Sequence, residues 1–148
     1  MSFSKTIAAV FGIGYLPKGG GTVAAAVYCL IWFLTPEDLP LFEIACLIVV
    51  LVLGIWSASR VETDWGTDSN RVVIDEFAGM MISLLFVPKR ISYLIFAFLF
   101  FRLFDILKPL GIRKTEKFPG GWGVMADDVL SGIYTWILLN IVLEMKLF

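Results

Sequence analysis

Histidine is absent from this chain of 148 residues, and charged residues are scarce. Only 17% of the residues are charged, compared with about 25% in ordinary soluble domains. The absence of histidine excludes Ser-His-Asp hydrolases, histidine-dependent phosphatases, zinc sites with a histidine ligand and haem held by histidine. The net charge is −1 and no strongly basic or acidic tail is present, so we expect no nucleic-acid partner and no obligate protein partner.

Cysteine is also rare, since the chain contains only Cys29 and Cys46. Both lie in apolar stretches, which is typical of inert thiols rather than of a disulfide or a metal site. The N-terminus does not have the pattern of a secretory signal, because Lys5 is followed by only a short apolar stretch that Gly12 interrupts. No repeat, low-complexity tract or linker divides the sequence, and we predict a single domain over residues 1–148.

Apolar residues are abundant instead, at 59% of the chain against about 45–50% in ordinary domains. They gather in five runs, each shorter than the roughly 20 residues that usually cross a bilayer. Short runs are compatible with a soluble helical bundle, but residues 44–56 have no polar face, which a soluble helix needs. We therefore predict an all-α fold, a multi-pass helical membrane bundle of about four or five apolar helices with short loops. The runs cover residues 23–34, 41–56, 72–87, 91–107 and 129–143.

Basic residues in the connecting segments predict the orientation of these helices. The N-terminal segment and residues 57–71 and 108–128 all contain lysine or arginine, whereas residues 35–40 contain neither. Because cytoplasmic loops carry the excess of lysine and arginine, we expect the first three segments to face the cytoplasm. Lys89 and Arg90 are exceptions, since they would lie on the opposite side.

Five acidic residues lie within or beside the apolar runs, where charge is costly and usually functional. In the alternating order of the helices, all five fall at helix ends on the same, cytoplasmic side. Arg102 lies one helical turn before Asp105, and Lys108 lies one turn after it, so both cationic side chains can reach the space around the Asp105 carboxylate. The five acids are Asp75, Glu76, Asp105, Asp127 and Asp128.

Five neighbouring carboxylates repel one another, and a divalent cation relieves that repulsion. Oxygen ligands without histidine or cysteine suit Mg²⁺, Ca²⁺ or Mn²⁺ rather than zinc. Arg102 and Lys108 can hold phosphate oxygens beside such a cation. The sequence therefore predicts phosphoryl transfer or phosphoester hydrolysis on a head group at the membrane surface. The five acids would supply the metal ligands and one general base or nucleophile.

Each part of this pattern also has a purely structural interpretation. The pairs Asp75-Glu76 and Asp127-Asp128 can be acids that the helix dipole favours at the start of a helix. Asp105 and Arg102 can form an ion pair within one helix. The convergence of all three positions on one side favours the functional interpretation.

Glycine-rich segments precede two of the expected helices. In residues 19–22 (GGGT), Gly21 and Thr22 can offer backbone N–H groups to a phosphate, although a plain turn explains the segment equally well. The segment is not a P-loop, because Lys18 precedes the glycines and no Lys-Ser/Thr pair follows them. The second glycine-rich segment contains Gly120, Gly121 and Gly123. These glycines would let a loop fold closely over the acidic site.

The acidic segments together resemble the phosphatidylglycerophosphatase A family, and the resemblance covers nearly the whole chain. The three motifs are specific only in combination. Gly12, Gly14, Gly21 and Thr22 are similar to the glycine-rich opening of that family, which usually has proline where this chain has Gly20. The segments are residues 74–80 (IDEFAGM), 101–109 (FRLFDILKP) and 120–132 (GGWGVMADDVLSG).

The resemblance implies a multi-pass enzyme of the bacterial inner (cytoplasmic) membrane with its active site facing the cytoplasm. It implies Mg²⁺-dependent hydrolysis of the lipid phosphatidylglycerophosphate to phosphatidylglycerol and phosphate. A CDP-alcohol phosphotransferase or another lipid head-group phosphoryl transfer enzyme is an alternative, but the Asp-Gly…Ala-Arg…Gly…Asp…Asp run of the former class is absent. A non-enzymatic ion carrier is a second alternative, which would spread its acids through the depth of the membrane.

Overall fold

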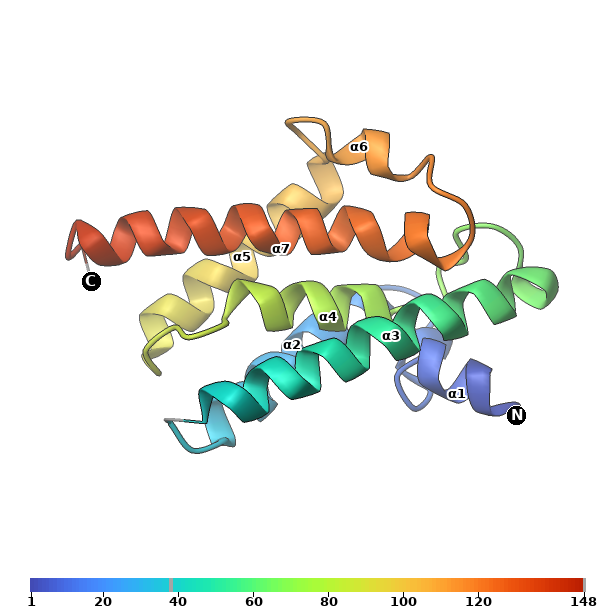
Figure 1. Cartoon of the computed structure of the whole chain (residues 1–148), viewed down its shortest axis with the longest axis horizontal. Coiled ribbons are helices and arrows are strands. Elements are labelled where there is room, and N and C mark those ends of the chain that lie inside the picture. Colours follow the sequence, from blue (N-terminus) through green and yellow to red (C-terminus); the bar gives the residue numbers. More distant parts are fainter. Residues whose placement is uncertain (38, 148) are drawn as a thin grey trace.

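The computed structural model describes residues 1–37 and 39–147, and within them the chain is helical throughout, with no strand (Figure 1). The prediction of an all-α fold is confirmed. Seven α-helices and one short 3₁₀ helix follow one another: α1 (Phe3–Ala8), η1 (Ile13–Tyr15), α2 (Gly20–Leu34), α3 (Pro40–Trp65), α4 (Ile74–Ser83), α5 (Ile91–Leu107), α6 (Ile112–Thr115) and α7 (Gly121–Glu144).

Helix α7 begins much earlier than the apolar pattern indicates. Gly121 and Gly123 form its first turn, whereas the sequence predicts a loop there. The backbone N–H of Gly121 donates to the Ser59 hydroxyl of α3 at 2.8 Å, which satisfies one of the free donors at the start of the helix. A Cβ atom at Gly123 would collide with the carbonyl oxygen of Phe118, so glycine lets the preceding segment fold back tightly here. Tertiary contacts therefore extend the helix into a sequence of low helix propensity.

Helix α4 lies at the centre of the bundle and packs against α2, α3, α5 and α7. Helices α2, α4 and α7 run from right to left in Figure 1, whereas α3 runs from left to right and ends on the side where the N-terminus lies. The C-terminus lies at the opposite end. The alternation of helix directions expected from the sequence is thus present.

The contact between α4 and α7 depends on two glycines. A Cβ atom at Gly132 of α7 would lie 2.5 Å from the carbonyl oxygen of Gly79 in α4. A Cβ atom at Gly79 would lie 2.8 Å from the carbonyl oxygen of Asp128 and would also collide with the ring of Phe101. The absence of both side chains lets the two helix backbones approach closely.

Two helices, α3 and α7, are long and apolar enough to cross a membrane. In the apolar part of α3 only 17% of the residues are buried, unlike in the core helix of a soluble protein. Helix α2 is apolar but has 15 residues, and α4 has 10, fewer than a span needs. Within the described residues, two of the four or five expected helices thus have the length and composition of a span. Together they suggest that the protein associates with a membrane.

Lys89 has a structural role at the far end of the bundle from the N-terminus. Its ammonium group donates to the carbonyl oxygens of Trp32 and Thr35 and, at 2.8 Å, to the Thr35 hydroxyl. These are acceptors at the C-terminus of α2, where a positive charge is favourable. The lysine that contradicts the basic-loop pattern therefore caps a helix.

We expect Gly132→Ala to lower the stability of the fold by about 1–3 kcal/mol, because the new methyl group would meet a backbone oxygen that cannot rotate away. The measurement is the thermal unfolding temperature of the purified protein in detergent. Ile133→Ala is the matched control, since Ile133 is the next residue of α7 and its side chain is 38% exposed. Equal unfolding temperatures for the two variants would contradict the close contact between α4 and α7.

Candidate metal centre

Three helices bring all five predicted acids to one cavity of about 430 Å³. The first turn of α4 supplies Asp75 and Glu76, and the last turn of α5 supplies Asp105. Asp127 and Asp128 come from α7, beyond its first turn, which contains no acid. The explanation of this last pair as acids favoured by the helix dipole at a helix start is therefore wrong, because the helix begins six residues before Asp127.

The carboxylates form two overlapping groups that share Asp128. One oxygen from each of Asp75, Asp127 and Asp128 lies within 4.8 Å of the others. The same holds for Glu76, Asp105 and Asp128. Asp128 is 1% exposed, so the shared residue lies almost wholly out of reach of solvent.

Three buried oxygen atoms in this cluster have no hydrogen-bond partner within the part of the chain that the structure describes. They are Asp75 Oδ1, Glu76 Oε2 and Asp128 Oδ2. A buried carboxylate oxygen without a partner costs free energy, and bound cations are one of the few ways to offset that cost. The donor set contains only oxygen, which fits a hard divalent cation. The cluster can therefore bind a metal ion.

Three cationic side chains line the cavity, Lys18, Arg102 and Lys108, and the last two are paired with carboxylates. Arg102 forms an ion pair with Asp105 one turn away on α5. Lys108 contacts Asp127 at 2.5 Å and also binds Glu116 in the segment after α6. Lys108 has a left-handed backbone conformation, φ 48°, where α5 ends before a proline.

The charge of Lys108 is secured by its neighbours. Burial lowers the pKa of the Lys108 ammonium group, but hydrogen bonds to Asp127 and Glu116 and the attraction of both carboxylates outweigh burial and raise the pKa above its usual value. A lysine whose pKa is raised stays protonated at neutral pH. It therefore brings a permanent positive charge to the cavity.

The glycine-rich segment before α2 contributes one of its two predicted residues. Gly21 lines the cavity, and a Cβ atom there would collide with the carboxylate of Glu76. Gly21 thus lets α2 approach the acids closely. Thr22 is exposed and is not among the described residues that line the cavity.

The sequence does not single out three further residues near the cluster. Glu116 binds Lys108, and Asp68 and Asn70 line the cavity from the segment between α3 and α4. The polar stretch that contains Asp68 and Asn70 was placed on the same side as the acids, so its position was a usable signal. Glu116 had no comparable signal, because its contact depends on how the chain folds around α6.

Comparisons with known proteins identify the family of this chain. The model of the family described as Phosphatidylglycerophosphatase A matches residues 6–143. A protein of Bacteroides thetaiotaomicron is 47% identical over 88% of this chain and 87% of its own length, and carries the provisional name phosphatidylinositol-3-phosphatase. A protein of Haemophilus influenzae named Phosphatidylglycerophosphatase A is 35% identical over 90% of this chain and 84% of its own length. A protein of Escherichia coli with the same name is 32% identical over 86% of this chain and 76% of its own length.

No solved structure matches the chain. The family match spans the three acidic segments and both glycine-rich openings, and several relatives align over most of their length. The chain belongs to the phosphatidylglycerophosphatase A family.

Proposed function

We propose that this protein is a phosphomonoesterase that hydrolyses phosphatidylglycerophosphate to phosphatidylglycerol and phosphate. The observation that carries the proposal is the buried carboxylate cluster with its three unpartnered oxygens, in a chain of this family. Lys108 and Arg102 border the same cavity, so the site combines a place for a cation with a place for a phosphate.

The cation is Mg²⁺ in this proposal, and its ligands come from Asp75, Glu76, Asp105, Asp127 and Asp128. When bound, Mg²⁺ neutralises part of the carboxylate charge and polarises the phosphoryl group. The ligand chemistry supports this choice, because magnesium prefers carboxylate oxygens combined with phosphate.

The side chains of the site have separate tasks in the reaction. Lys108 and Arg102 bind the non-bridging oxygens of the phosphomonoester and orient it, because both are charge-assisted donors beside the cavity. A carboxylate of the cluster accepts the proton of the attacking water. The water oxygen bonds to phosphorus as the bond between phosphorus and the glycerol oxygen breaks. The leaving oxygen takes up the proton that the carboxylate accepted, which gives the free hydroxyl of phosphatidylglycerol.

The site lies at the cytoplasmic side of the membrane in this proposal. The acids share their end of the bundle with the N-terminal segment and the segments between α3 and α4 and between α5 and α7. These are the segments with the excess of lysine and arginine that marks cytoplasmic loops. The protein would then be a multi-pass protein of the bacterial inner membrane.

A second candidate substrate follows from the name of one relative. The Bacteroides protein, 47% identical to this chain, is provisionally named for a phosphatase of phosphatidylinositol 3-phosphate. Both lipids carry a phosphomonoester on an anionic head group, so the same carboxylates and cations would serve either. They differ in the group that bears the phosphate, which is a glycerol in one lipid and an inositol ring in the other.

Phosphate release from the two lipids tests the proposal directly. We expect the purified protein in detergent micelles with Mg²⁺ to hydrolyse phosphatidylglycerophosphate with a kcat/KM at least about tenfold above that for phosphatidylinositol 3-phosphate. Addition of EDTA in excess over Mg²⁺ should abolish release, and added Mg²⁺ should restore it. A preference for the inositol lipid would favour the second candidate, and release that resists EDTA would contradict the metal.

Asp128→Asn should lower kcat/KM at least about 100-fold, since the loss of even an outer-shell partner of a metal site costs 10–100-fold. The variant should also lose the Mg²⁺-dependent rise in unfolding temperature, which for the unaltered protein corresponds to about 2.7 kcal/mol at a hundred times the dissociation constant. Asp64→Asn is the control, because Asp64 is an exposed acid of α3 that pairs with Lys5. An Asp128→Asn variant with full activity would refute the assignment.

Lys108→Met should lower kcat/KM about 10–100-fold, because a hydrogen bond to a charged group contributes about 1.5–3 kcal/mol. The change removes a cation from the cavity and leaves Asp127 without its partner. Lys114→Met, which removes a lysine of α6 that does not line the cavity, serves as control. Equal kinetics of the two variants would exclude Lys108 from phosphate binding.

A further inference from the structure

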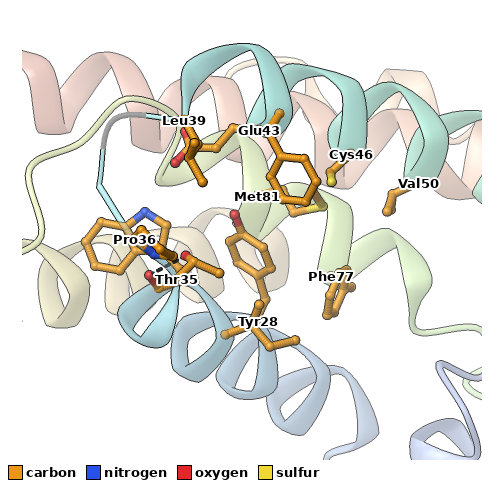
Figure 2. A pocket seen from close by; sticks show the side chains of 12 residues that line it. Tyr28, Thr35, Pro36, Leu39, Glu43, Cys46, Val50, Phe77 and Met81 are labelled. Carbon is orange, nitrogen blue, oxygen red and sulfur yellow. Dashed lines mark hydrogen bonds between the residues drawn. The ribbon is translucent and has the colours of Figure 1, made fainter.

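A second cavity, of about 370 Å³, lies between α2, α3 and α4 and is lined almost entirely by apolar atoms (Figure 2). Figure 2 shows side chains from these three helices around a common space. The function proposed above does not use this cavity. Its lining includes Tyr28, Trp32, Cys46, Val50, Phe77 and Met81.

This apolar cavity follows the acidic cavity along α2 and α4. Phe77 of its lining directly follows Glu76 in α4, and its ring meets the ring of Tyr28 edge to face at a centroid distance of 5.2 Å. On α2, Gly21 lies against Glu76, and Tyr28 follows it two turns later, about 10 Å along the helix. The two cavities therefore succeed one another along the pair of helices α2 and α4.

The apolar cavity is open to the surface of the bundle at the end of α2 and the start of α3. Three of its lining residues, Ile31, Leu39 and Phe42, are exposed by 43%, 43% and 59%. Thr35 and Glu43, two of its polar residues, come from the C-terminal end of α2 and the first turn of α3, away from the acids. A molecule that enters from the acidic side therefore meets apolar side chains first.

We propose that this cavity holds an acyl chain of the phospholipid whose phosphate occupies the acidic cavity. The inference rests on the proposed function, because it assigns the second part of the same substrate. A phospholipid has a charged head joined to a hydrocarbon chain, and the two cavities that follow one another along α2 and α4 have the same order of polarity. Burial of hydrocarbon contributes about 0.8 kcal/mol for each methylene group, so the cavity provides affinity and holds the head group in place.

Photo-crosslinking tests the occupant without any need for turnover. The probe is a phosphonate analogue of phosphatidylglycerophosphate with a diazirine at the middle of one acyl chain, and phosphatidylcholine with the same chain is the reference. With the full-length protein in nanodiscs, we expect the phosphonate lipid to label peptides of the cavity at least about fivefold more than the reference lipid does. Equal labelling by the two lipids would identify the cavity as a surface for bulk lipid and overturn the proposal, as would labelling confined to other surfaces.

A variant that fills the cavity gives a second, kinetic test. Cys46→Phe should raise KM for a dipalmitoyl substrate about tenfold and leave KM for the dihexanoyl substrate unchanged, because only the long chain reaches the blocked space. Ala26→Phe is the control, since Ala26 lines a separate apolar groove between α2 and α5. Changes that are equal for both substrates, or absent, would overturn the proposal.

The two tests separate failure of this inference from failure of the proposed function. An unaltered protein that hydrolyses neither lipid would refute the proposed function, and the crosslinking result would then decide the occupant alone. An active protein whose Cys46→Phe variant shows no dependence on chain length would refute only the acyl-chain site.

Discussion

The concentration of five carboxylates, three of them buried and two half-buried, at one end of an apolar bundle is the constraint on which the rest of the structure depends. Among the described residues that line the cavity, three carry positive charge, Lys18, Arg102 and Lys108. Arg102 is already paired with Asp105, and Lys108 with Asp127. Six acids line the same cavity: Asp68, Asp75, Glu76, Asp105, Asp127 and Asp128. Three buried oxygens remain without a partner among the described residues. Such an arrangement lowers the stability of the fold, because buried charges without partners raise the free energy of the folded state. A bound cation offsets the repulsion, so the free energy lost in folding is recovered when the ligand binds.

Close helix packing makes this concentration of charge geometrically feasible. Gly79 and Gly132 let α4 and α7 approach until their backbones nearly touch, and Gly21 lets α2 reach Glu76. A side chain at any of these glycines would push two helices apart and separate the acids that each helix carries. The glycines and the acids therefore serve one arrangement: the glycines bring the helices together, and the acids occupy the space at the end of the contact.

The sequence predicts the positions of site residues well where helix direction determines them. It predicts them poorly where the fold of a connecting segment determines them. Runs of apolar residues alternate in direction, so the end at which each acid lies follows from counting helices, and all five acids do meet in one cavity. The start of α7 and the contact between Lys108 and Glu116 depend on contacts that the chain makes only after folding. Thr22 was predicted beside the phosphate because it follows the glycines, but the helix that begins at Gly20 directs this residue outward to an exposed position.

The division of the cavity between helices and loops explains how related chains can act on different lipids. Helices supply the carboxylates and Arg102, and these groups would contact only the cation and the phosphate. Helix α2 adds Gly20 and Gly21, and Lys108 follows the end of α5. The rest of the lining comes from two connecting segments, residues 16–19 and residues 68–72. A head group larger than the phosphate must extend toward these segments, because the helices enclose the cavity on its other sides. Under the proposed function, the choice between a glycerol and an inositol would therefore depend on these connecting segments, because loops can vary without disturbing the acids on the helices.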